Sequence, residues 1–156
     1  MDLKQLYQDI ILEHGKSPRN FGRCKKHTHE AKGYNPLCGD KVQIFLNLNE
    51  EKKVENLTFE GSGCAISMAS TSIMTELVKG KSLEATKKIV FDFLDMIKNT
   101  QEIKSEELDE DQKTTIMSLS GVKQYPMRVK CATLAWHTLN SAMSEKKEEV
   151  NTEAID

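Results

Sequence analysis

The fold of this chain is decided by residues 42–79, which read VQIFLNLNEEKKVENLTFEGSGCAISMASTSIMTELVK. Apolar side chains occupy every second position at the start, at Val42, Ile44, Leu46 and Leu48, which is typical of a half-buried β-strand. Polar residues 49–53 turn the chain, and residues 54–60 form the returning strand. After Gly61-Ser62-Gly63 the apolar period becomes helical. The stretch therefore predicts two antiparallel strands followed directly by a helix.

Upstream of this stretch the sequence predicts one helix and one more strand. The helix begins at Leu3, with Asp2 as its N-cap and Gly15 as its expected end. A basic, turn-rich segment follows, and a short strand over residues 28–34 completes the sheet. We therefore expect a small antiparallel three-stranded β-sheet.

Downstream of the stretch the patterns are helical. Ser82 is the expected cap of one helix, and Pro126 suits the first turn of a last helix that ends near Met143. The charged residues 99–113 between them predict a solvated insertion. Strands followed mainly by helices indicate an α+β fold, with the sheet packed against several α-helices.

Length and composition predict one domain and exclude several classes of protein. The 156 residues suit a single domain, which we place at residues 1–144, and residues 145–156 lack apolar periodicity and predict a flexible tail. The net charge of -2 gives no general attraction to nucleic acid. Neither a membrane-spanning run nor a secretory pattern is evident, so we expect a cytoplasmic protein.

Cysteines and one aspartate are the strongest chemical signal. Cys24, Cys38, Cys64 and Cys131 are far apart and form no C-x-x-C pair. In the cytoplasm thiols are kept reduced, so the sequence does not favour a disulfide framework. All but Cys24 lie at the ends of expected elements, and the positive end of a helix dipole would lower the pKa of Cys64. With Asp40 they would complete a tetrahedral zinc site. The alternative is that each cysteine is a small buried apolar residue.

Four motifs follow one another along residues 3–143. They are Leu6-Tyr7 through Pro18-Arg19-Asn20, Asn35-Pro36-x-Cys38-Gly39-Asp40, Gly61-x-Gly63-Cys64-Ala65-Ile66-Ser67-x-Ala69-Ser70, and Arg128-x-Lys130-Cys131-Ala132-x-Leu134-x-Trp136. In this order they resemble the U-type iron–sulfur cluster assembly proteins, a superfamily that includes the N-terminal domain of NifU. The resemblance is closer to the SufU branch than to the IscU branch.

Two features distinguish the branches. IscU proteins have a histidine immediately before the last cysteine, where this chain has Lys130, and SufU proteins carry an insertion that matches residues 99–121. The resemblance therefore implies a zinc-bound sulfur acceptor that takes persulfide sulfur from a PLP-dependent cysteine desulfurase. The sulfur would pass to a downstream iron–sulfur scaffold. The alternative is a scaffold on which a [2Fe-2S] cluster is assembled and transferred, and whether the chain counts as a sulfurtransferase enzyme stays open.

The resemblance also implies roles for individual residues. The zinc ligands would be Cys38, Asp40, Cys64 and Cys131, with iron or a transient cluster as the alternative occupant. Cys38 would accept the sulfur. Arg128 and Lys130 would lie next to the ligands and offset their negative charge, and the alternative for Arg128 is an ordinary surface arginine. Independently of the resemblance, the net positive charge of residues 16–32 predicts that this stretch helps to dock the desulfurase through complementary charge.

Overall fold

The computed structural model describes residues 2–99, 103, 105–146 and 148–154. Its five α-helices and four strands follow one another along the chain as α1 (Leu3–Lys16), β1 (His29–Asn35), β2 (Asp40–Leu48), β3 (Val54–Ser62), α2 (Ala65–Val78), α3 (Leu83–Asn99), α4 (Glu110–Ser118), α5 (Pro126–Met143) and β4 (Val150–Asn151). Short 3₁₀ helices follow α4, at Leu119–Gln124, and β4, at Thr152–Ala154. The α+β class is confirmed. None of the described helices is long and apolar enough to cross a membrane.

The sheet has four strands in the order β3-β2-β1-β4. The first three strands are antiparallel, as expected, but β4 pairs in parallel with β1. The prediction of a three-stranded antiparallel sheet is therefore wrong in one detail. A strand of two residues carries no detectable period, and its pairing depends on β1, which is more than 100 residues earlier in the chain.

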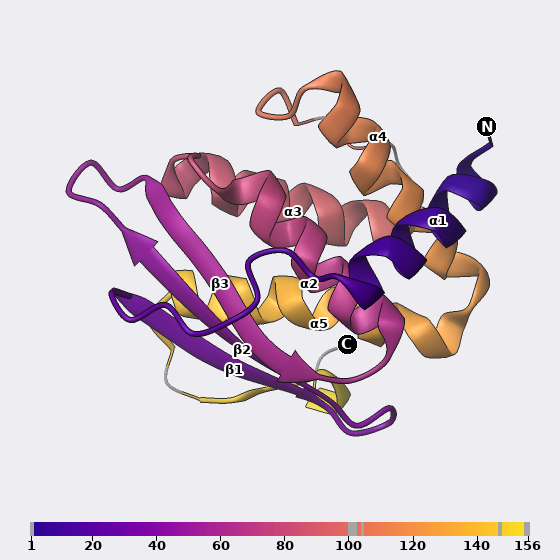
Figure 1. The fold of residues 1–156 in the computed structure, drawn as a ribbon, viewed down its shortest axis with the longest axis horizontal. Coiled ribbons are helices and arrows are strands. Elements are labelled where there is room, and N and C mark those ends of the chain that lie inside the picture. The colour runs from indigo at the N-terminus through magenta and orange to yellow at the C-terminus, as the bar shows by residue number, and fades with distance from the viewer. Residues whose placement is uncertain (1, 100–102, 104, 147, 155–156) are drawn as a thin grey trace.

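Helices cover one face of this sheet (Figure 1). Helix α5 packs against β1 and β2, α2 packs against α5, and α1 packs against α2. Trp136 of α5 lies at the centre of the core, where its ring stacks on Phe93 at 4.0 Å and its indole nitrogen donates to Ser70 Oγ at 2.9 Å. This packing fixes α5, and therefore its first turns, relative to the ends of β1 and β2.

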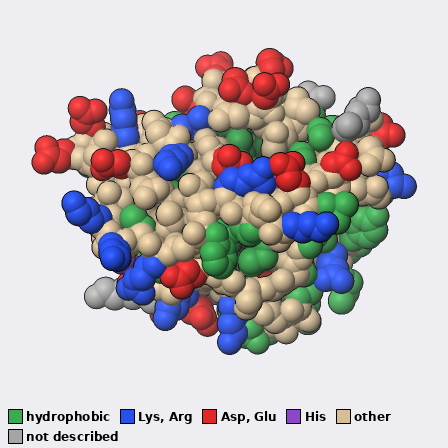
Figure 2. Space-filling view, viewed as in Figure 1, with side chains coloured by type: hydrophobic (Ala, Val, Ile, Leu, Met, Phe, Trp, Pro, Cys, Tyr) green, Lys and Arg blue, Asp and Glu red, His purple; other side chains and the backbone are tan. Residues whose placement is uncertain are grey.

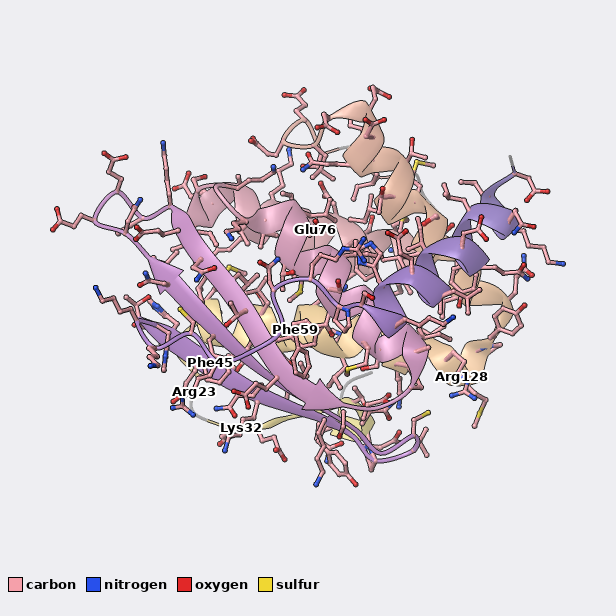
Figure 3. All side chains as sticks on the ribbon, in the orientation of Figure 1. Arg23, Lys32, Phe45, Phe59, Glu76 and Arg128 are labelled. Carbon is pink, nitrogen blue, oxygen red and sulfur yellow. The ribbon has the colours of Figure 1, made fainter. Side chains whose placement is uncertain are left out.

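The basic segment before β1 covers Phe45 on the face of the sheet opposite the helices. Phe45 is fully buried because the Arg23 guanidinium lies 5.2 Å from its ring centroid and the His27 ring contacts its edge. Arg19 pairs with Glu13 and Glu76. Lys and Arg side chains gather along the lower left of the molecule in Figure 2, where Figure 3 labels Arg23 and Lys32. Part of the positive charge thus has a structural role.

Two expectations about local structure need correction. Helix α1 continues through Gly15 to Lys16, and a Cβ on Gly15 would lie 3.2 Å from the Cβ of Ala65, so this glycine permits close packing of α1 and α2. The charged insertion is anchored, because Ile103 and Leu108 are buried in the core. Ile103 and Leu108 are five positions apart among acidic residues, which matches neither the helical nor the strand period, so the sequence did not predict their burial.

The segment expected to be a flexible tail contains β4 and a buried side chain. Val150 and Asn151 pair with Gly33 and Tyr34 of β1, and Thr152 is only 1% exposed. The pairing satisfies backbone groups at an edge of β1 that would otherwise be open. Residues 150–152 are thereby placed next to the β1–β2 turn.

Candidate metal centre

The turn between β1 and β2 presents the first groups of the site. Asn35 and Asp40 are paired residues at the two sides of the turn, and Gly39 closes it with a positive φ of 73° and a backbone N–H that donates to Asn35 O. Side chains alternate across a sheet, so Asp40 shares the helix-facing side with Val42 and Ile44. The sheet therefore directs a polar pair toward the start of α5, and leaves Cys38 at the turn itself.

The Asp40 carboxylate is completely buried and held at both oxygens. Oδ1 accepts the backbone N–H of Cys64 at 2.9 Å, and Oδ2 accepts the side-chain amide of Asn35 at 3.1 Å. A Cβ at Gly63 would lie 2.4 Å from Oδ1, so only glycine lets the β3–α2 loop approach this closely. No ion pair among the described residues involves Asp40. Both hydrogen bonds to its carboxylate come from neutral donors.

Cys38 and Cys131 bring their sulfurs next to this carboxylate. The Cys131 thiol lies 3.2 Å from Cys38 Sγ, and Asn35 Nδ2 lies 3.5 Å from Cys131 Sγ. One ligand atom from each of Cys38, Asp40 and Cys131 falls within a group no wider than 4.8 Å. Cys131 is fully buried on α5, whereas Cys38 is partly exposed. The more accessible sulfur is thus on the turn.

Cys64 lies beside this group of three without forming part of it. It is the N-cap of α2, and it is half-buried. Its pKa is lowered from 9.0 to about 6, chiefly by the neighbouring Cys131 thiol and also by the backbone N–H groups of Ser67 and Ile66. The same contact and burial raise the pKa of Cys131. The lowered pKa at a helix start agrees with the sequence-based expectation, although a thiol is the larger cause.

Arg128 and Lys130 have different surroundings. Arg128 Nη1 lies 3.8 Å from Cys38 Sγ, on the exposed side of the turn, and Figure 3 shows it at the end of the molecule opposite Arg23 and Lys32. Lys130 Nζ instead lies 3.2 Å from Glu153 Oε1 in the C-terminal segment. Arg128 therefore contacts a thiol, and Lys130 joins α5 to the end of the chain.

The donor set suits a thiophilic divalent metal. Soft thiolate sulfurs and one carboxylate, in a partly buried group, are typical of zinc sites. A buried carboxylate without a cationic partner also calls for positive charge nearby. The residues therefore fit zinc by type and by proximity. Cys24 lies elsewhere, with its thiol hydrogen-bonded to Lys26 O and to Asn56.

Asn35 is a site residue whose role the sequence did not reveal. It stands in the motif before Pro36, but nothing in its spacing predicts that its amide contacts both Asp40 and Cys131. One signal was available: Asn35 and Asp40 are polar residues on either side of an expected turn, where strand pairing would place them opposite each other.

Sheet, helices and donor set together define a small α+β protein with a thiol-rich candidate metal centre at one end of its sheet. The model of the NifU-like N-terminal domain matches residues 6–150. The chain belongs to this family.

Relatives and solved structures agree with this assignment. The chain is 36% identical over 146 residues to the zinc-dependent sulfurtransferase SufU of Bacillus subtilis, covering 94% of this chain and 95% of that protein. It is 35% identical to the iron–sulfur cluster assembly scaffold protein IscU of Streptococcus pyogenes, covering 90% and 84%. A crystal structure from Fervidobacterium islandicum AW-1, described as a scaffold protein for the SUF system, has a TM-score of 0.77 and 32% identity, covering 89% and 97%.

Proposed function

We propose that this chain is a zinc-bound sulfur acceptor of iron–sulfur cluster assembly. In this function it takes persulfide sulfur at Cys38 from a PLP-dependent cysteine desulfurase and passes it to a downstream scaffold. The observation that carries the proposal is the partly exposed Cys38 thiol at the β1–β2 turn, next to buried Cys131 and Asp40. The similarity to the zinc-dependent sulfurtransferase SufU supports it.

Cys38, Asp40, Cys64 and Cys131 would hold the zinc. Cys64 belongs to this set by its contact with Cys131 and by its backbone bond to Asp40, although its sulfur is outside the tightest group. When bound, zinc keeps coordinated thiols deprotonated. Three thiolates, one carboxylate and Zn²⁺ carry a formal charge of about -2. The Arg128 guanidinium and the Asn35 amide would offset this charge.

The chemical step belongs to Cys38. Its thiolate attacks the outer sulfur of the desulfurase persulfide, a new S–S bond forms at Cys38, and the old S–S bond breaks. The desulfurase cysteine leaves as a thiolate, so no external oxidant or reductant is needed. Arg128 would stabilise the negative charge that the terminal sulfur carries on Cys38.

A scaffold for a [2Fe-2S] cluster is the second candidate, because the same three thiols and Asp40 could ligate iron and because IscU is a relative. Lys130 argues against it. Its amine pairs with Glu153 and offers no ligand at the position before Cys131.

Two measurements test the proposal. Protein purified without added metal should contain about one zinc per chain, and iron with acid-labile sulfide in its place would favour the scaffold. After one turnover with cysteine and desulfurase, mass spectrometry should find one added sulfur on the Cys38 peptide. Added sulfur on Cys131 or Cys24, with Cys38 unmodified, would move the acceptor role elsewhere.

A further inference from the structure

The C-terminal segment reaches the candidate metal centre. Strand β4 continues the β1 edge in parallel, with Val150 opposite Gly33 and Asn151 opposite Tyr34. The next residue, Thr152, is 1% exposed, and its hydroxyl lies 3.0 Å from Asn35 Oδ1. A residue at the end of the chain thus contacts the amide that contacts the metal-binding group.

The Asn35 amide has a defined orientation. Its Nδ2 faces Asp40 Oδ2 at 3.1 Å and Cys131 Sγ at 3.5 Å, so both of its N–H groups point at acceptors. Oδ1 must then accept a hydrogen bond, and Asn35 is fully buried from water. Thr152 Oγ1 is the donor that the structure supplies. A rotation of the amide by 180° would place its oxygen against the Asp40 carboxylate and the Cys131 sulfur, and both contacts would be lost.

We infer that Thr152 is a positioning residue for the metal centre, an inference that rests on the proposed function. Its hydroxyl keeps the Asn35 amide aimed at Asp40 and Cys131, and so keeps two ligand groups in place. Without the hydroxyl, Asn35 Oδ1 is buried without a hydrogen-bond donor. If the amide rotates to reach another donor, it no longer contacts Asp40 and Cys131. Groups that orient metal ligands are typically worth 10- to 100-fold in metal affinity.

An ion pair fastens the same segment. Lys130 Nζ lies 3.2 Å from Glu153 Oε1, and these two residues adjoin Cys131 and Thr152. Both side chains are substantially exposed, so salt screens the pair. The buried hydroxyl should therefore matter more than the ion pair, and Glu153→Gln separates the two contributions.

Zinc affinity of the full chain, measured by competition with a chromophoric chelator, is the first test. Thr152→Val keeps the shape of the side chain and removes the donor, and should weaken zinc binding by about 10-fold or more. Thr152→Ser restores the hydroxyl and should bind close to the native affinity. Thr138→Val is the matched control, because this buried hydroxyl donates to Leu134 O in its own helix. Native affinity in Thr152→Val would overturn the inference.

Hydrogen exchange of the Asn35 side-chain amide, followed by NMR on protein as purified, is the second test and depends on no zinc titration. We expect exchange to become about 10-fold faster in Thr152→Val and to stay native in Thr152→Ser and Thr138→Val. If exchange is faster in Thr152→Val but the native protein binds no zinc, the proposed function is refuted and the positioning role of Thr152 stands. Zinc binding with unchanged exchange would refute the positioning role alone, even if affinity fell.

Discussion

Replacing Gly63 with alanine tests the geometry of the metal centre most directly. The new Cβ would lie 2.4 Å from Asp40 Oδ1 and 3.0 Å from the Asp40 Cα, with a φ of 157° at the substituted residue. An ordinary carbon–oxygen contact needs about 3.4 Å, so loop and carboxylate must separate by about 1 Å. The 2.9 Å bond from Cys64 N to Oδ1 would then open to nearly 4 Å and cease to be a hydrogen bond.

The energetic consequence follows from that lost bond. A hydrogen bond to a charged group contributes about 1.5–3 kcal/mol, and 1.4 kcal/mol corresponds to about one factor of ten in an equilibrium constant. If Asp40 is a zinc ligand, Gly63→Ala should weaken zinc binding by about 10- to 100-fold. The assay is chelator competition, with the melting temperature of the zinc-loaded protein as a second measurement.

Gly80→Ala is the matched control. Gly80 also has a positive φ, of 86°, but a Cβ there meets nothing within 4 Å. The control therefore reports the cost of backbone conformation alone, which lowers stability but leaves zinc affinity near native. Equal zinc affinity in Gly63→Ala and Gly80→Ala would refute the argument that close approach of this loop positions Asp40.

Four further outcomes are expected. Cys38→Ser should abolish stimulation of desulfurase turnover in a folded protein, whereas Cys24→Ser should leave it intact. Removing the metal by chelation should lower the melting temperature by roughly 10 °C or more, because structural zinc contributes to folding; an unchanged melting curve would contradict the zinc site. Burial lowers the pKa of His14 from 6.5, so the unfolded chain binds its proton at higher pH than the folded chain. Urea unfolding should therefore show stability falling as pH drops below about 6.5, with a shallower fall in His14→Gln. Trp136→Phe removes the indole bond to Ser70 and should cost about 1–3 kcal/mol of unfolding free energy by the same assay; a cost near zero would contradict its place in the core.

Much of the fold is determined by local sequence pattern. Strands β2 and β3 have an alternating pattern and a connecting turn of their own, and α5 begins and ends at the expected Pro126 and Met143. Asp2 and Ser82 cap the expected helices, since a cap depends only on residues three or four positions away. The motifs around Cys38, Cys64 and Cys131 likewise indicated the candidate ligands before the structure was known.

Tertiary structure decided what those residues contact. Proximity of Cys38, Asp40 and Cys131 depends on α5 crossing the sheet, and this crossing depends on side chains of the core that are remote in sequence. Arg128 and Lys130 lie on the same helix, and the sequence did not show that they contact different groups. Arg128 contacts Cys38 at the β1–β2 turn, and Lys130 contacts Glu153 in the C-terminal segment. Strand β4 and the Thr152–Asn35 bond join residues 117 positions apart. Pairing and burial of this kind have no local period, because the partner that stabilises them is supplied only when the chain has folded.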